Sequence, residues 1–292
     1  LNMRNFALLT ILTCLLLTLR VVEKNYRSAQ SDFIPAEKSA QSNHPEQTGI
    51  SGLSEVTFHT SNGLRIAGWY APPSNHAAIV LIPGSNVDRS FILPEVRILA
   101  HAGFGVLSFD WPGSGDSEGK VRWGKDERLA LTAAIDWLSN RNEIDPQRIG
   151  GLGHSMGGYI MAQVAASDPR IRSVLLAATP PDFIEYVRWT HRDWSILSQL
   201  PAELAVRNAG FIQDAPTPKE SVKSISPRPI FFIGGDHDPQ VPEAMFRELF
   251  NAAAEPKSLW IVPGAEHGGY SKAAADTYPP KLVEFFSRTL SN

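Results

Sequence analysis

The stretch RIGGLGHSMGG, residues 148–158, decides how this chain is interpreted. Its first half is apolar, as in a buried strand, and its second half opens a helix, so GHSMG matches GxSxG at the junction. A serine on so tight a turn needs small residues two positions away, and Gly153 and Gly157 meet that need. The start of the helix directs backbone N–H groups and its positive dipole end at Ser155. Ser155 is therefore the candidate nucleophile, and the N–H of Met156 is a candidate donor to a developing negative charge.

Short apolar strands and longer helical stretches alternate on both sides of this motif. Regular alternation of this kind is typical of βαβ units, which build a parallel sheet with right-handed crossovers. We therefore predict an α/β fold with a mostly parallel central sheet and helices on both faces. The expected strands are residues 78–82, 105–110, 148–153, 173–178, 229–235 and 258–264, and the expected helices lie near 92–102, 126–140, from 156 onward and near 278–290.

A hairpin precedes the alternation, and an insertion interrupts it. Residues 55–60 and 64–71 predict two strands around Ser61-Asn62-Gly63, a turn whose Asn-Gly pair tolerates positive φ. Between about residues 180 and 226 the alternation stops, and several aromatic residues precede more helical sequence. We expect a small helical cap insertion there, within a folded domain that covers residues 53–292.

An activated serine needs an imidazole to accept its proton and an acid to orient the imidazole. Asp238 follows the expected strand at 229–235, and His267 follows the next strand, so both lie at carboxyl ends, where active sites of open α/β sheets collect. Asp236 is a nearby rival, but Asp238 lies farther beyond the strand end. Two other histidines are also rivals of His267, namely His154 beside the serine and His237 beside the acid. We predict that Ser155, Asp238 and His267 act together.

A second backbone donor is expected in the loop LIPGSNVD, residues 81–88. This loop follows an expected strand and contains small residues, so the N–H of Ser85 is the candidate partner to that of Met156. An ordinary turn is the alternative reading of the same composition.

Over roughly residues 53–290 the chain resembles the α/β-hydrolase superfamily, whose triads follow the chain order serine, acid, histidine. DWPGSGDSEG, residues 110–119, matches the family's DxxGxGxSxG loop, and GGDHDPQVP, residues 234–242, matches its acid-bearing GxxDxxVP segment. The resemblance is to the serine aminopeptidase-like, dienelactone hydrolase-like and prolyl oligopeptidase-like branch. It implies a structural role for Asp110. Many members have His-Gly at the oxyanion loop, whereas this chain has Pro83-Gly84, which leaves only a backbone role there.

The resemblance implies a serine hydrolase that cleaves carboxylic esters through an acyl-enzyme intermediate. A serine aminopeptidase-like peptidase of the same fold is the alternative, and the expected substrate is a small-molecule ester or a short peptide. A non-catalytic binding protein and a cofactor-free haloperoxidase or lyase are further alternatives, because one fold supports many functions.

Composition narrows the partners and the chemistry. A net charge of −3 provides no strong field for nucleic acid, so no nucleic-acid partner is expected. Cys14 is the only cysteine, which excludes disulfides within the chain and cysteine-rich zinc sites. The sequence carries no cofactor motif, so we expect no cofactor and no metal, and the chemistry must use oxygen and imidazole groups.

The N-terminal segment differs from the rest of the chain. An apolar run from Phe6 to Leu19 follows Arg4, which is typical of a signal anchor or a signal peptide, and we assign it to residues 1–22. No convincing small-x-small cleavage site follows, so we favour a retained membrane anchor, with the catalytic domain outside the cytoplasm; a secreted protein is the alternative. Residues 23–52 are polar and predict a flexible tether.

Overall fold

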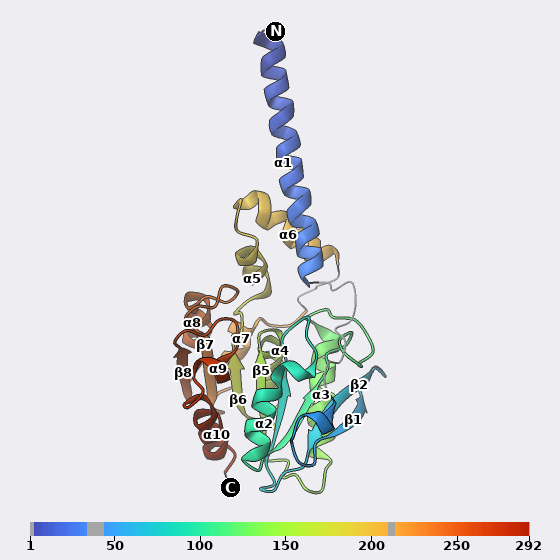
Figure 1. Ribbon diagram of the computed structural model, residues 1–292, viewed down its shortest axis with the longest axis vertical. Coiled ribbons are helices and arrows are strands. Elements are labelled where there is room, and N and C mark those ends of the chain that lie inside the picture. The colour runs from blue at the N-terminus through green and yellow to red at the C-terminus, as the bar shows by residue number, and fades with distance from the viewer. Residues whose placement is uncertain (1–2, 34–43, 210–213, 292) are drawn as a thin grey trace. The chain divides into compact units, whose positions relative to one another are not determined.

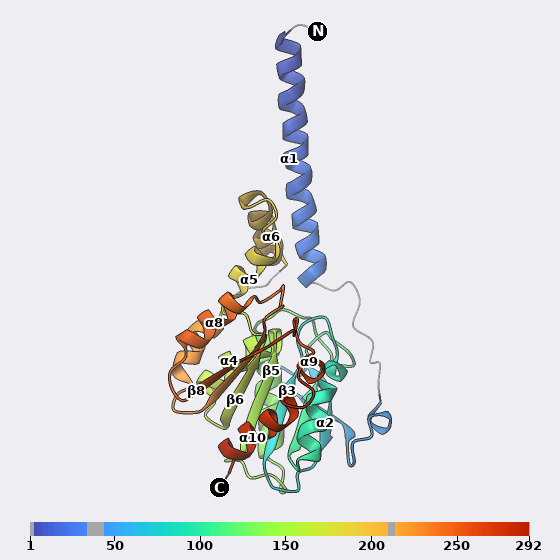
Figure 2. The same ribbon diagram turned by 60° about the vertical axis from the view of Figure 1, so that its left-hand side comes forward.

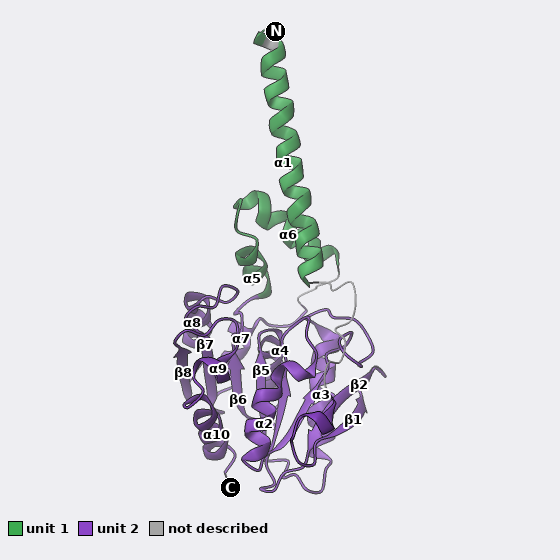
Figure 3. Cartoon of the chain, viewed as in Figure 1, with its two compact units in different colours: residues 1–36, 183–212 green, residues 37–182, 213–292 purple. Residues whose placement is uncertain are grey.

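The computed structural model describes residues 3–33, 44–209 and 214–291 of the chain (Figure 1). The chain forms two compact units, which Figure 3 distinguishes by colour. Unit 1 joins residues 1–36 to residues 183–212, and unit 2 comprises residues 37–182 and 213–292. Each unit is described separately below.

Unit 2 is built on an eight-stranded sheet in the order β1-β2-β4-β3-β5-β6-β7-β8. The first two strands form the expected hairpin, and β2 also pairs antiparallel with β4, whereas all other neighbours are parallel. The sheet is therefore mostly parallel, as the sequence predicts. Its strands are β1 (Ser54–His59), β2 (Arg65–Ala71), β3 (Ala78–Ile82), β4 (Gly105–Phe109), β5 (Ile149–His154), β6 (Ile171–Ala177), β7 (Ile230–Gly235) and β8 (Lys257–Val262).

Helices cover both faces of this sheet (Figure 2). One face packs against α2 (Leu93–His101), α9 (Tyr270–Ala273) and α10 (Tyr278–Thr289). The other face carries α3 (Lys125–Ser139), α4 (Met156–Ser167) and α8 (Glu243–Ala252), with the short α7 (Pro218–Ser221) between α4 and α8. Because β3 to β6 are buried along almost their whole length, their sequences are continuous apolar runs rather than alternating ones. The α/β prediction is confirmed.

Unit 1 combines the N-terminal helix α1 (Met3–Phe33) with α5 (Phe183–Thr190) and α6 (Ile196–Asn208). Phe33 packs edge-on against the rings of Phe183 and Tyr186, with ring centroids 5.4 and 5.9 Å apart. Nε2 of His191 lies 3.5 Å from the carboxylate of Asp32. The two helices of the insertion therefore share a packed core with the second half of α1.

This arrangement differs from the expected organisation at two points. The sequence predicts a tether from Glu23 onward, but α1 continues as a helix to Phe33, and the predicted tether also covers residues 34–43, which lie outside the described residues. The expected insertion, about residues 180–226, includes α7, which belongs to unit 2.

By length and composition, α1 could cross a membrane. The span Asn5–Phe33 has a mean hydropathy of 2.0 in its most apolar window, and none of that window is buried. A signal sequence has the same properties, so α1 is consistent with either a membrane anchor or a signal sequence.

Candidate active site

Ser155 lies between the end of β5 and the start of α4, with φ 53° and ψ −115°. This backbone conformation is strained for a non-glycine residue, and it is held by a 2.8 Å hydrogen bond from the N–H of Ser155 to the carbonyl of Ala177. A Cβ at Gly153 would collide with the carbonyl of Gly157, and a Cβ at Gly157 would collide with the carbonyl of Ile82. The two glycines of GHSMG therefore allow the close backbone approach that presents Ser155.

A continuous chain of polar contacts connects the three residues singled out from the sequence. Nε2 of His267 lies 2.9 Å from Oγ of Ser155, and Nδ1 of His267 lies 2.8 Å from Oδ2 of Asp238. The other carboxylate oxygen of Asp238 accepts hydrogen bonds from the N–H groups of Gln240 and Val241, at 2.8 and 2.9 Å. Ser155 and Asp238 are buried, and the side chain of His267 is only 13% exposed. The structure thus brings the three predicted residues within hydrogen-bond distance.

The rival residues lie elsewhere. Asp236 accepts a 2.7 Å hydrogen bond from the N–H of Gly264 and pairs with His237, which is exposed. His154, next to the serine in sequence, is buried. Its ring lies 5.1 Å from the ring of His267, centroid to centroid. None of these three residues contacts Oγ of Ser155.

His154 is an uncharged neighbour of the site. Burial, with a smaller contribution from His267, lowers the pKa of His154 to about 3, so its ring is neutral at physiological pH. Both of its ring nitrogens are buried without a hydrogen-bond partner in the described part of the chain. A neutral ring at this position adds no positive charge beside His267.

Two backbone N–H groups near Ser155 have no acceptor among the described residues. Met156 is the first residue of α4, so its N–H has no partner within the helix. The N–H of Ser85, in the loop after β3, likewise donates to no described group. The preceding residue, Gly84, approaches Ser155 so closely that a Cβ at Gly84 would lie 3.3 Å from Cβ of Ser155. The loop after β3 and the start of α4 therefore converge beside the serine hydroxyl.

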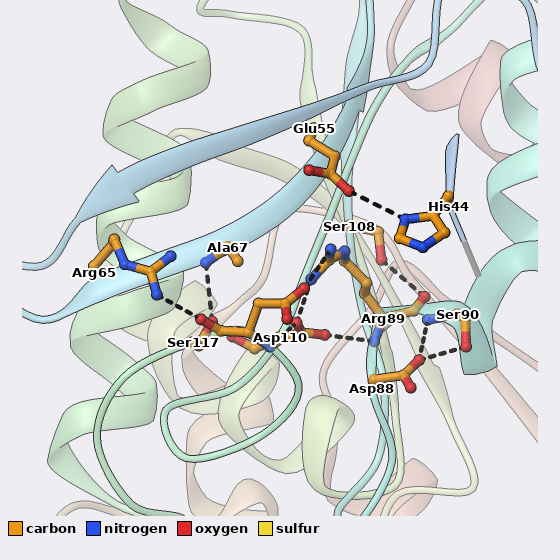
Figure 4. A network of polar contacts seen from close by, with 11 residues as sticks. His44, Glu55, Arg65, Ala67, Asp88, Arg89, Ser90, Ser108, Asp110 and Ser117 are labelled. Carbon is orange, nitrogen blue, oxygen red and sulfur yellow. Dashed lines mark hydrogen bonds and ion pairs between the residues drawn. The ribbon is translucent and has the colours of Figure 1, made fainter. Parts of the chain in front are cut away.

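A buried ion pair holds the two loops that flank this region (Figure 4). The guanidinium of Arg89, after β3, pairs with the carboxylate of Asp110, after β4, and both side chains are almost fully buried. Asp110 also accepts hydrogen bonds from the backbone N–H groups of Arg89 and Asp116, at 2.7 and 2.9 Å. Ser117 closes the loop by donating to the carbonyl of Asp110 at 2.8 Å.

The loop after β3 has a second attachment, because Nε1 of Trp111 donates to the carbonyl of Pro83 at 2.9 Å. The contacts of Arg89 with Asp110 and of Trp111 with Pro83 connect the DxxGxGxSxG loop to the segment that carries Ser85. The role of Asp110 is therefore to hold the loop geometry.

Sequence reasoning missed a cavity of about 180 Å³ beside the loop that follows His267. Glu95 lies in its wall, where burial raises the pKa of the carboxyl to about 7, and Tyr278 donates to Glu95 at 2.9 Å. The hydroxyl of Tyr270 is buried there without a partner among the described residues. Tyr278 is 183 positions from Glu95 in the sequence, so no local pattern reveals their pairing. The cavity is lined by Phe91, Ile92, Pro94, Glu95, Leu152, His154, Ala177, Gly268, Gly269, Tyr270, Ser271 and Tyr278.

Within the described residues, no group of three or more His, Cys, Asp or Glu side chains is arranged to hold a metal ion. Oγ of Ser155 lies within hydrogen-bond distance of an imidazole that is itself held by a carboxylate. The geometry thus suits acyl transfer to and from a serine hydroxyl.

Several known proteins are similar to this chain. An uncharacterised protein of Mycobacterium tuberculosis is 30% identical over 219 residues, which is 73% of this chain and 72% of that protein. The uncharacterised protein YfhR of Escherichia coli K12 is 29% identical over 247 residues, 81% of each chain. A polyketide transferase of a Penicillium species, grgF, is 24% identical over 285 residues, 82% of this chain and 97% of that protein.

Solved structures show the same fold. The Pyrococcus furiosus esterase Pf2001 superimposes with a TM-score of 0.72 at 22% identity, covering 87% of this chain and 99% of the esterase. The Penicillium α/β hydrolase GrgF superimposes with a TM-score of 0.64, also at 22% identity, over 82% of this chain and 99% of GrgF. The profile of the prolyl oligopeptidase family matches residues 89–292, which include every residue of the Ser155–His267–Asp238 contact chain. This protein is thus an α/β-fold hydrolase that belongs to the prolyl oligopeptidase family.

Proposed function

We propose that this protein hydrolyses carboxylic esters through an acyl-enzyme on Ser155. The observation that carries the proposal is the contact chain in which Asp238 meets Nδ1 of His267 and Nε2 of His267 meets Oγ of Ser155. With Nδ1–H donating to Asp238, Nε2 is the acceptor for the serine proton. Asp238 keeps His267 in that tautomer and stabilises the imidazolium that forms.

In the first half of the reaction, His267 takes the proton of Ser155 while Oγ bonds to the ester carbonyl carbon. The N–H groups of Ser85 and Met156 are the proposed donors to the carbonyl oxygen as it becomes negative. The tetrahedral intermediate then breaks its bond to the alcohol, which leaves with the proton held on His267. In the second half, His267 takes a proton from water as its oxygen bonds to the acyl carbon. The second tetrahedral intermediate then breaks its bond to Oγ, which takes the proton back from His267, and the carboxylic acid leaves.

The lining of the cavity beside His267 supports an uncharged substrate. His154 is neutral, Tyr270 and Tyr278 carry hydroxyl groups, and the Glu95 carboxyl has its pKa raised to about 7. An aminopeptidase substrate carries a free ammonium, which needs a fixed carboxylate to offset its loss of water.

Covalent labelling tests the proposal directly. The folded chain should react with a fluorophosphonate probe at Ser155, and both Ser155→Ala and His267→Ala should abolish the labelling. Hydrolysis of p-nitrophenyl acyl esters should be lost in the same two variants. A folded wild-type chain that is not labelled and does not hydrolyse these esters would overturn the proposal.

Peptide hydrolysis is the second candidate, favoured by the family match over residues 89–292. The same residues would cleave an amide, with His267 protonating the amine that leaves. Comparing p-nitrophenyl esters with aminoacyl and prolyl p-nitroanilides of matched acyl groups separates the two. A kcat/KM for an anilide equal to that for the matched ester would place peptide hydrolysis first.

We also propose that α1 is a retained anchor and that unit 2 lies outside the cytoplasm. Retention is supported by the sequence after the apolar run, which offers no convincing small-x-small cleavage site. Alkaline phosphatase fused to the C-terminus of the full chain should be active. A fluorescent C-terminal green fluorescent protein fusion, together with an inactive phosphatase fusion, would contradict this topology.

A further inference from the structure

Helix α6 presents an apolar face to solvent. Ile196, Leu200 and Leu204 recur every fourth residue, and Leu197 adjoins them, so the four side chains form one stripe along the helix. Each of them is between 40% and 63% exposed, and Trp194, just before the helix, is 60% exposed. Clusters of exposed large apolar side chains on one helix face are uncommon on soluble surfaces and mark an interaction site.

The opposite face of α6 is already occupied within unit 1. Ala202, Ala205 and Val206 are fully buried, and α6 lies beside the second half of α1 in both views (Figures 1 and 2). Asn208, at the end of α6, donates to the hydroxyl of Tyr26 on α1 at 3.2 Å. The helix is therefore apolar on two faces, one packed inside unit 1 and one uncovered.

The uncovered stripe, defined here as Trp194, Ile196, Leu197, Leu200 and Leu204, belongs to the same unit as the apolar part of α1 (Figure 3). Along α1, exposed apolar side chains extend to Leu19, and the helix then becomes polar where it packs against α5 and α6. A bilayer that holds the apolar part of α1 must have its boundary near the start of this polar half. That boundary lies next to the elements that carry the stripe.

Charged and aromatic residues fit the same location. Arg20 and Lys24 follow the apolar run of α1, and Arg192 precedes the stripe; Arg27 and Arg207 lie nearby and are paired with Glu23 and Glu203, at 2.6 and 2.8 Å. Basic side chains favour the anionic headgroups of a membrane surface, and tryptophan concentrates at the boundary between headgroups and acyl chains. Trp194 stands at the start of the stripe with its ring largely exposed.

We propose that α6 lies in the interface of the bilayer that α1 spans, with the stripe buried at the boundary between headgroups and acyl chains. The occupant of this surface is thus a lipid bilayer with anionic headgroups. Unit 1 then contacts the membrane twice, through α1 across the bilayer and through α6 along its surface. This inference concerns unit 1 alone; it rests on the proposed retention of α1 as an anchor and not on the reaction proposed for Ser155.

Site-directed spin labelling of the full chain tests the proposal. Because Cys14 is the only cysteine, Cys14→Ser provides a background in which Ile196→Cys, Leu200→Cys and Leu204→Cys can each carry a nitroxide. The chains are reconstituted into vesicles of phosphatidylcholine and phosphatidylglycerol, and the accessibility of each nitroxide to oxygen and to a water-soluble nickel chelate is measured. Asn140→Cys, at the exposed end of α3, is the aqueous control.

All three stripe positions should show an oxygen-to-nickel accessibility ratio severalfold above that of position 140. Ratios equal to that of position 140 would overturn the proposal. Spin–spin broadening at the stripe that disappears on dilution with unlabelled chain would also overturn it, because the stripe would then be covered by a second copy. Circular dichroism checks that each variant is folded, and three positions on one stripe keep the test decisive if one of them is not tolerated.

Discussion

Asp238 uses its two carboxylate oxygens differently. Oδ2 faces Nδ1 of His267, whereas Oδ1 accepts from the N–H groups of Gln240 and Val241. The two N–H donors fix the carboxylate, so that its other oxygen defines the orientation of the imidazole. Orientation and tautomer of His267 therefore depend on a single acceptor atom.

Asp238→Asn should lower kcat by about 10³- to 10⁴-fold with little change in KM. The amide oxygen can still accept from Gln240 and Val241, which leaves an NH₂ group facing His267 and forces the proton onto Nε2. With its proton on Nε2, the ring cannot accept from Ser155. The measurement is steady-state hydrolysis of a p-nitrophenyl ester.

Asp236→Asn is the matched control, since Asp236 bonds to the N–H of Gly264 and does not contact His267. Its kcat should stay within a fewfold of the wild type. Equal losses in the two variants would mean that Asp238 has no special role in orienting His267.

Glu95 should make folding stability depend on pH. Burial raises its pKa from the usual 4.5 to about 7, so the folded chain keeps a proton that the unfolded chain loses above 4.5. The free energy of unfolding should therefore fall as pH rises from 4.5 to about 7 and then level off, by about 3 kcal/mol in total. Urea unfolding across this window should show a smaller fall for Glu95→Gln, which keeps the hydrogen bond from Tyr278.

Glu284→Gln is the control, because Glu284 is exposed on α10 and its substitution removes a carboxyl group that is not buried. The free energy of unfolding of this variant should vary with pH in the same way as that of the wild type. If the free energy of unfolding of Glu95→Gln also varied with pH as that of the wild type does, the pH dependence could not be assigned to Glu95.

The site residues that the sequence predicts and those that it misses differ in the kind of sequence pattern that surrounds them. Ser155 is marked by local constraints, because glycines at 153 and 157 must accompany a strained elbow, and Asp238 and His267 follow strands whose carboxyl ends share one edge of the sheet. Glu95 and Tyr278 meet across 183 positions of sequence, and neither residue type is unusual where it stands. Nothing local identifies such a pair.

At the scale of elements, the loop from Asp110 to Gly119 is held by its buried carboxylate. Gly115 has φ +44°, and a Cβ there would collide with the carboxylate of Asp110. Gly115→Ala should therefore displace Asp110 from Arg89 and destabilise unit 2 by about 3–5 kcal/mol, the usual cost of breaking a buried ion pair. Urea unfolding followed by tryptophan fluorescence measures this loss.

Gly264→Ala is the control that separates the effect of the collision with Asp110 from the effect of backbone strain. Gly264 also has positive φ, at +73°, but a Cβ there would meet nothing within 4 Å. Its substitution should cost only about 1 kcal/mol, the strain of a left-handed non-glycine residue. If the two variants lose equal stability, the carboxylate of Asp110 does not restrict position 115.

The strands were predictable because buried parallel strands are short continuous apolar runs, such as AIVLI of β3. The second half of α1 was not predictable in this way. Asn25, Ala29 and Phe33 recur every fourth residue and are buried, but polar residues surround them, and the helices that cover them lie more than 140 positions later in the chain. A partner so distant in sequence leaves only a weak periodic signal in the segment itself.

At the scale of the whole molecule, the division into two units predicts that unit 1 can lose structure while unit 2 keeps it. Phe33 is 4% exposed and packs edge-on against Phe183 and Tyr186. Phe33→Ala should destabilise unit 1 by about 3–5 kcal/mol, because a buried aromatic ring is lost and a cavity remains. Amide hydrogen exchange in α5 and α6 should therefore accelerate, while exchange in β5 and α4 stays unchanged.

Phe6→Ala provides the contrast within the same helix, since Phe6 is 63% exposed and lies outside that core. In detergent, its exchange pattern should match the wild type throughout α5 and α6. If Phe33→Ala also left α5 and α6 unchanged, the second half of α1 would contribute nothing to holding the insertion. If Phe33→Ala accelerated exchange in β5 and α4 as well, the two units would unfold together.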